Sequence, residues 1–157
     1  MGRGVSDLRI PKIRISLTLV LTTGTLEAEV FLADYAATHA GPERILDVLG
    51  GADRFFPVMI EDQVLLVCRD ALRWVRVGAD HFDDPLQGLS EERVAVQLRD
   101  GAWLQGTARF DAPKGRARLL DYLNAPGHFL PLFEAGEVVL VSRAEIAKVQ
   151  FLQERVP

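Results

Sequence analysis

The order of hydrophobic and polar positions predicts short β-strands and one short helix in the first half of the chain. Over residues 13–21 apolar side chains alternate with polar ones, which is typical of a strand with one buried face. Thr22-Thr23-Gly24 predicts a turn, and the alternation resumes over residues 26–32 as a second, antiparallel strand. A helix is predicted over residues 43–49, because it begins with Gly41-Pro42 and ends at a glycine pair.

Three further strands are predicted after this helix. Residues 55–60 form the third, and Pro57 within it cannot donate a backbone hydrogen bond, which predicts an edge or a bulge there. Residues 64–68 are continuously apolar and predict a fourth strand that is buried on both faces. Leu72, Val75 and Val77 mark a short fifth strand. The predicted order of elements is therefore ββαβββ.

The second half repeats this pattern. A shift of 74 positions aligns residues 44–77 with residues 118–151 without a gap. Before the aligned block, Asp100-Gly101 predicts a hairpin turn between two alternating strands, as in the first half. The identical pairs include Arg44/Arg118, Leu46/Leu120, Asp47/Asp121, Leu49/Leu123, Phe55/Phe129, Pro57/Pro131, Leu66/Leu140, Val67/Val141, Arg69/Arg143 and Val75/Val149.

The sequence thus predicts a mainly β (α+β) protein made of two tandem copies of a ββαβββ unit, related by internal duplication. Two long repeats favour a pair of small β-barrels over an open solenoid. The predicted division is a flexible N-terminal segment at residues 1–12, a first β-barrel repeat at 13–77, a linker at 78–92, a second β-barrel repeat at 93–152 and a tail at 153–157.

Two stretches of the second unit resemble the signatures of Sm-like proteins, whose domains are small SH3-like β-barrels. Residues 94–111 resemble the first signature, with two strands around Asp100-Gly101 and a following Gly106 and Asp111. Residues 138–149 resemble the second. The resemblance implies a bent five-stranded barrel in each unit and RNA as a ligand. The helix between the second and third strands departs from the Sm-like order, and the Sm-like RNA-contacting residues are not recognisable.

Composition and charge narrow the possible functions. The 157 residues are 48% hydrophobic and 25% charged, as in an ordinary globular protein. A formal charge of -4 offers no excess of basic side chains for a phosphate backbone, which disfavours nucleic acid as a partner. The single Cys68 cannot form an internal disulfide, and no apolar run is long enough to span a membrane. The start of the chain lacks the order of a signal peptide, and a cytoplasmic location is expected.

Four polar residues on the predicted helices recur in both units. Arg44 precedes Asp47 by three positions, and Arg118 precedes Asp121 in the same way, so each pair shares one helix face. A solvated ion pair of small energetic effect accounts for this spacing. The alternative is a polar binding surface that both units share.

Two arginines and two tryptophans are further candidates for an interaction site. Arg69 and Arg143 each follow an apolar strand, where a guanidinium can bind an anion or carboxylate or can instead cap the carbonyls of a neighbouring turn. Trp74 and Trp103 have no large counterpart in the other unit. They mark either a contact between the units, a contact with an outside partner, or simple core filling.

No catalytic, cofactor-binding or metal-binding arrangement is recognisable. The sequence has no G-x-S-x-G, phosphate loop or dinucleotide fingerprint. His39, His81 and His128 lie in three different loops without the spacing of metal ligands. Cys68 is expected to be an inert core thiol. We therefore expect no enzyme activity, no cofactor and no metal.

The resulting prediction is a non-enzymatic cytoplasmic binding or assembly module of two Sm-like units, with a protein partner or self-association. Two alternatives stay open at this point. One is an RNA-binding Sm-like protein, and the other is a small-molecule or anion sensor that uses Arg69 and Arg143.

Overall fold

The computed structural model describes residues 12–33, 36, 41–82, 90–110 and 118–152. The N-terminal segment before Lys12, His39, residues 83–89 of the expected linker and the tail at 153–157 lie outside the described residues. The described part is mainly β, with two short helices. Its elements are β1 (Lys12–Leu21), β2 (Gly24–Ala33), α1 (Ile45–Leu49), β3 (Phe55–Ile60), β4 (Gln63–Cys68), β5 (Leu72–Gly78), β6 (Ser90–Leu98), β7 (Trp103–Phe110), α2 (Arg118–Asn124), β8 (Phe129–Glu134), β9 (Glu137–Ser142) and β10 (Ile146–Phe151).

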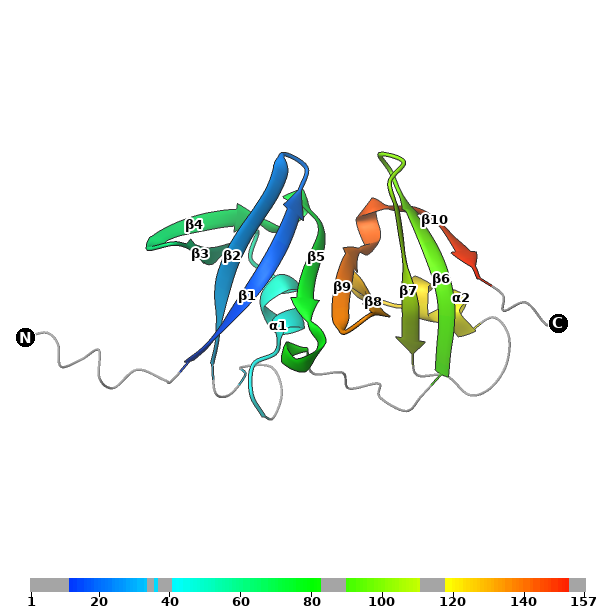
Figure 1. Ribbon diagram of the computed structural model, residues 1–157, viewed down its shortest axis with the longest axis horizontal. Coiled ribbons are helices and arrows are strands. Elements are labelled where there is room, and N and C mark those ends of the chain that lie inside the picture. Colours follow the sequence, from blue (N-terminus) through cyan, green and yellow to red (C-terminus); the bar gives the residue numbers. More distant parts are fainter. Residues whose placement is uncertain (1–11, 34–35, 37–40, 83–89, 111–117, 153–157) are drawn as a thin grey trace, which may run out of the picture.

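All ten strands belong to one antiparallel sheet in the order β10-β6-β7-β8-β9-β5-β1-β2-β3-β4. The first five strands form one half of this sheet and the last five the other. The halves join where β5 runs beside β9, in the middle of the molecule (Figure 1). The opposite ends of the sheet are β4 and β10.

The β1–β2 hairpin follows from the alternation in its sequence. Ile15, Leu17 and Leu19 are buried, whereas the intervening positions are more exposed, and β1 pairs with β2 along its whole length. Gly24 begins β2 with a φ of 145°, a conformation that side chains with a Cβ rarely adopt. Period-two burial of this kind fixes which face of a strand turns inward.

The two hydrophobic cores are built with residues from both halves. The first core contains Leu19, Ile45 and Leu49 of the first half, and also Val138 and Leu140 of β9. In the second core, Trp74 of β5 packs against buried residues of β6 to β9. Each half therefore completes its apolar packing with a strand from the other half, which makes the β5–β9 junction part of the fold.

The linker is shorter than expected. The strand β6 begins at Ser90, and Phe82, within the expected linker, is 9% exposed and packs in the first core.

Pro57 does not lie at an edge of the sheet. It belongs to β3, which is flanked by β2 and β4 and is therefore not the last strand of the sheet. Its missing N–H is tolerated because β3 pairs with β2 only through Glu29 and Met59.

Candidate interaction surface

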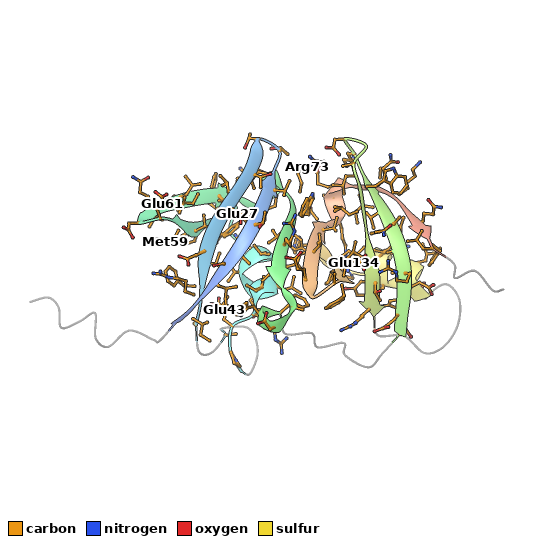
Figure 2. The ribbon with its side chains drawn as sticks, viewed as in Figure 1. Glu27, Glu43, Met59, Glu61, Arg73 and Glu134 are labelled. Carbon is orange, nitrogen blue, oxygen red and sulfur yellow. The ribbon has the colours of Figure 1, made fainter. Side chains whose placement is uncertain are left out.

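The outer edge of β4 carries an uncovered apolar surface. Three consecutive side chains of β4, Val64, Leu65 and Leu66, are 62%, 42% and 65% exposed, and Phe55 on the neighbouring β3 is 53% exposed. This hairpin projects away from the second half, with Glu61 at its tip (Figures 1 and 2). The strand contains no charged residue, although charged side chains commonly protect a sheet edge from pairing.

The prediction that residues 64–68 are buried on both faces is wrong. Val67 is buried, but residues 63–66 are exposed. The reason is the position of β4 at the end of the sheet, where the described residues supply β3 as its neighbour on one side and no strand on the other. The apolar sequence of β4 therefore exceeds what the described residues cover.

The counterparts of these residues in the second half are buried. Val138 and Leu140 of β9 have no exposed surface, and Phe129 of β8 is 8% exposed. The strand β5 runs along the outer edge of β9, and all three side chains pack in the first core, to which β5 contributes Leu72, Val75 and Val77. The comparison identifies what β4 lacks, namely a strand like β5 along its outer edge.

The other end of the sheet is also uncovered. Among the described residues, β10 pairs with β6 and has no second neighbour. Phe151 is 52% exposed, and Gln150 is exposed beside a shallow depression that Trp103 and Leu104 help to line. The described part of the molecule thus ends in two free strand edges, one on each side of Figure 1.

Arg69 binds the carbonyl groups at the end of α1. Its Nε donates to the carbonyls of Val48 (3.2 Å) and Leu49 (3.1 Å), and Nη1 donates to the carbonyl of Asp53. The guanidinium also lies over the ring of Phe56. The last carbonyls of a helix have no partner within the helix, so this arginine supplies them with donors.

Arg143 has the same role at α2. Its Nε donates to the carbonyl of Phe129 (3.2 Å), and Nη1 donates to the carbonyls of Tyr122 (3.1 Å) and Ala125 (2.8 Å). The Tyr122 ring lies 4.7 Å from the guanidinium carbon. Of the two interpretations given above for these arginines, the contacts favour capping of turn carbonyls.

The structure nevertheless brings the two arginines to one place. Arg69 and Arg143 both line a hollow between the two halves, together with Asp70, His128 and Glu145. Most of the guanidinium donors are directed at carbonyls, and two carboxylates share the hollow. A bound anion would have to displace these contacts, so the geometry does not favour an anion site.

The helical Arg/Asp residues are placed at the beginnings of α1 and α2. Asp47 accepts a hydrogen bond from the backbone N–H of Arg44 through Oδ2 (2.7 Å), as in a helix N-terminal capping interaction. Arg118 begins α2, and Asp121 lies in its first turn and is exposed. For Asp47 this geometry supports a structural role at the helix end.

The two tryptophans lie in different surroundings. Trp74 is opposite Val141 across the β5–β9 junction and packs against the second core. Trp103 is 48% exposed, and the ammonium of Lys148 lies 5.8 Å from its ring centroid. Trp74 is therefore part of the contact between the halves, whereas Trp103 faces outward near β10.

Charged side chains also connect the halves at the β5–β9 junction. Arg73 lies between the two halves (Figure 2), 2.5 Å from Asp100 and 3.6 Å from Glu145. Its side chain is only 16% exposed. The hydrogen bond from Arg73, followed by the backbone N–H of Ala102, lowers the pKa of Asp100 from its ordinary value of 3.8. Because Arg73 belongs to the first half and both carboxylates to the second, these ion pairs connect the two halves.

We expect the ion pair between Arg73 and Asp100 to make the free energy of unfolding depend on pH. A carboxyl whose pKa is lowered by folding stabilises the fold above its unfolded pKa, and this stabilisation disappears as the pH falls through the folded pKa. Asp100→Asn should therefore be less stable than the wild type at pH 7, and the difference in unfolding free energy should close below about pH 4. Urea unfolding at several pH values measures this difference.

Asp70→Asn is the matched control, because Asp70 is 85% exposed and its ion pair with Arg54 is 4.0 Å long. At pH 7 its free energy of unfolding should differ from that of the wild type by less than about 0.5 kcal/mol. A gap for Asp100→Asn that persists unchanged at pH 3 would show that the charge of Asp100 does not stabilise the junction.

No further chemistry is evident in the described residues. They contain no cluster of three or more His, Cys, Asp or Glu side chains that could hold a metal ion. Neither described helix has the length and apolar character needed to cross a membrane. Comparisons with protein-family models, curated proteins and solved structures gave no match. The free sheet edges are therefore the strongest basis for a functional conclusion.

Sequence reasoning missed the residues that form these edges. The apolar run Val64-Leu65-Leu66 predicts a buried strand, and Phe151 is correctly predicted in the last strand, but neither pattern indicates an exposed edge. One signal in the sequence could have identified them. The alignment at a shift of 74 matches β4 with β9 and β5 with β10. In the described structure only β5 and β9 pair with each other, which leaves β4 and β10 at the ends of the sheet.

Proposed function

We propose that this chain is a non-enzymatic assembly module that binds a protein along the free edge of β4. The observation that carries the proposal is the exposure of Phe55, Val64 and Leu66, whose counterparts in the second half are buried in the first core beside the β5–β9 junction. An edge strand presents unpaired backbone N–H and C=O groups, which an added strand can satisfy while its side chains cover the apolar ones. Uncovered apolar clusters of this kind mark interaction sites.

A protein partner fits this edge better than a nucleic acid or a membrane surface. The turn that leads into the apolar strand holds Glu61 and Asp62 at the hairpin tip, so phosphate groups would be repelled there. Several arginines of the described residues lie beside carboxylates, such as Arg93 at 2.8 Å from Glu134 and Arg109 at 3.0 Å from Glu91. Binding of RNA stays a prediction of the Sm-like resemblance.

We also infer that the two halves are duplicated small barrels of the Sm-like type. The support is the same order of strands and helix in each half, together with the residue identities at a constant spacing. The hairpin turns after β3 and β8 agree as well, because Glu61 and its counterpart Ala135 both have positive φ angles, 55° and 50°. The lone Cys68 supports the cytoplasm as the proposed location.

The test is quantitative affinity capture from cells in which the chain is native. Leu66→Lys places a charge in the middle of the β4 edge, and Leu120→Lys places the same charge on an exposed apolar residue of α2. We expect a set of proteins to be captured by the wild type and by Leu120→Lys and to be lost with Leu66→Lys. Equal capture by both variants would contradict the proposed edge.

A further inference from the structure

The β5–β9 junction shows how this fold covers a strand of the β4 type. In its antiparallel register Val75 is opposite Leu140, and Val77 is opposite Val138. All four side chains are buried and belong to the first core. The junction is therefore a strand pairing with an apolar seam along one face.

The two free edges of the molecule are the counterparts of these two strands. Residue numbers in the second half exceed their counterparts by 74, so β10 corresponds to β5, and β4 corresponds to β9. We infer that β10 of one copy of this chain pairs antiparallel with β4 of the next copy. The inference rests on the proposed function and names its partner. The pairs it predicts are Lys148 with Val67, Val149 with Leu66, Gln150 with Leu65, and Phe151 with Val64.

The side chains of these edges match in the predicted register. Val149 and Phe151 lie opposite Leu66 and Val64, in the places of Val75, Val77, Leu140 and Val138 at the junction. Phe151, Val64 and Leu66 are all more than half exposed in a single copy. Their pairing would bury an apolar seam of the same kind as the one that already joins the two halves.

The polar residues of the two edges are also compatible. At the β5–β9 junction Arg76 lies 3.7 Å from Glu137. Their counterparts are Gln150 and Gln63, two amides that can donate to and accept from each other. Arg73 and Glu145 correspond to Ala147 and Ala71, so the outer contact buries no counterpart of that ion pair.

Lys148 is the one charged side chain of β10, and its position leaves the edge accessible. Its ammonium lies over the ring of Trp103 at 5.8 Å. Lys148 pairs with Gln97, and Gln97 pairs with Trp103, so the ammonium is directed across β6 toward β7. The free edge of β10 lies on the other side. Lysine commonly blocks an edge strand when it lies over the edge itself.

The position of the edges determines the kind of assembly. β4 and β10 lie at opposite ends of the sheet (Figure 1), so the two edges of one copy do not meet each other. Contacts between copies are then head to tail. A contact of this kind builds a closed ring when its rotation closes and a filament when it does not.

Sedimentation velocity of the purified chain over a range of concentrations is the first test. We expect the average mass to rise with concentration. Leu66→Lys and Phe151→Lys each place a charge in one side of the contact, and both positions are exposed in one copy, so circular dichroism should show an unchanged fold. Each variant alone should bind itself at least about 30-fold more weakly than the wild type. Leu120→Lys should assemble as the wild type does.

Mixing the two edge variants tests the head-to-tail arrangement. Leu66→Lys keeps an intact β10 edge, and Phe151→Lys keeps an intact β4 edge, so an equimolar mixture should form a dimer and nothing larger. Self-association that persists in Phe151→Lys would indicate symmetric pairing of two β4 edges and would overturn the inference. A wild type that stays monomeric at every concentration would also overturn it. If such a monomer still captured another protein through Leu66, the proposed function would stand without the inference.

Cysteine cross-linking tests the register. In a Cys68→Ser background, a chain with Leu65→Cys and a second chain with Gln150→Cys should form a disulfide-linked heterodimer on oxidation, because directly paired residues are close enough for this bond. Val149→Cys should not form it with Leu65→Cys, since neighbouring positions of a strand face opposite sides. Equal cross-linking of both pairs would overturn the predicted pairing.

Discussion

Replacing Leu140 with alanine is expected to lower the free energy of unfolding by about 3 kcal/mol, within the range of about 2–5 kcal/mol for buried leucines. Leu140 has no exposed surface and packs in the core of the opposite half. The cavity should therefore weaken the junction as well as the core. Trp74 reports on the junction and Trp103 on the second half by fluorescence, whereas circular dichroism follows the strands of both halves, and we expect one coincident transition that shifts as a whole.

Leu66→Ala is the matched control, because it makes the same change at the counterpart position in β4. Leu66 is 65% exposed, so in dilute solution the free energy of unfolding should change by no more than about 0.5 kcal/mol. Equal losses for the two variants would mean that the repeat positions have the same environment. Separate transitions of the two halves would mean that the junction does not couple them.

Arg143→Ala is expected to cost about 2–4 kcal/mol of stability. The change removes donors from the carbonyls of Tyr122, Ala125 and Phe129, which lie at the end of α2 and the start of β8. Chemical denaturation gives the magnitude directly. Arg143→Lys should restore little, because an ammonium cannot reproduce the fork that reaches several carbonyls at once.

Arg54→Ala provides the comparison for a surface arginine. Arg54 is 76% exposed, and its ion pair with Asp70 is long at 4.0 Å, so its loss should change stability by less than about 0.5 kcal/mol. If Arg143→Ala changed the free energy of unfolding as little as Arg54→Ala, the contacts of Arg143 with the carbonyls would not contribute to stability. An anion-binding role for Arg143 would then regain support.

The sequence was sufficient to predict most strands, because a strand with one buried face has alternating apolar and polar residues. Ile15, Leu17 and Leu19 show this directly in β1, and Gly24 marks the turn that follows. The first helix was predicted from its ends, since glycine and proline act on the backbone locally. Such local signals do not depend on which strands become neighbours.

The exposure of β4 could not be predicted in the same way. Val64 and Val138 belong to similar apolar runs, and these runs predict that both side chains are buried. Val138 is covered by β5, which is distant in sequence, whereas the described residues offer no second strand to Val64. The partners of Arg69 and Arg143 were hidden for the same reason, because the carbonyls they bind are far along the chain.

Each copy contributes two halves, so every closed ring of copies contains an even number of halves. Two kinds of joint would alternate around it, the inner joint with Arg76 and Glu137 and the outer joint with Gln150 and Gln63. The inner joint connects two halves of one chain, so dilution cannot separate them. The outer joint connects different copies, so dilution can separate it. Since the outer joint has no counterpart of the inner pairs Arg76–Glu137 and Arg73–Glu145, salt should have little effect on the size of the assembly, and protein concentration should determine it.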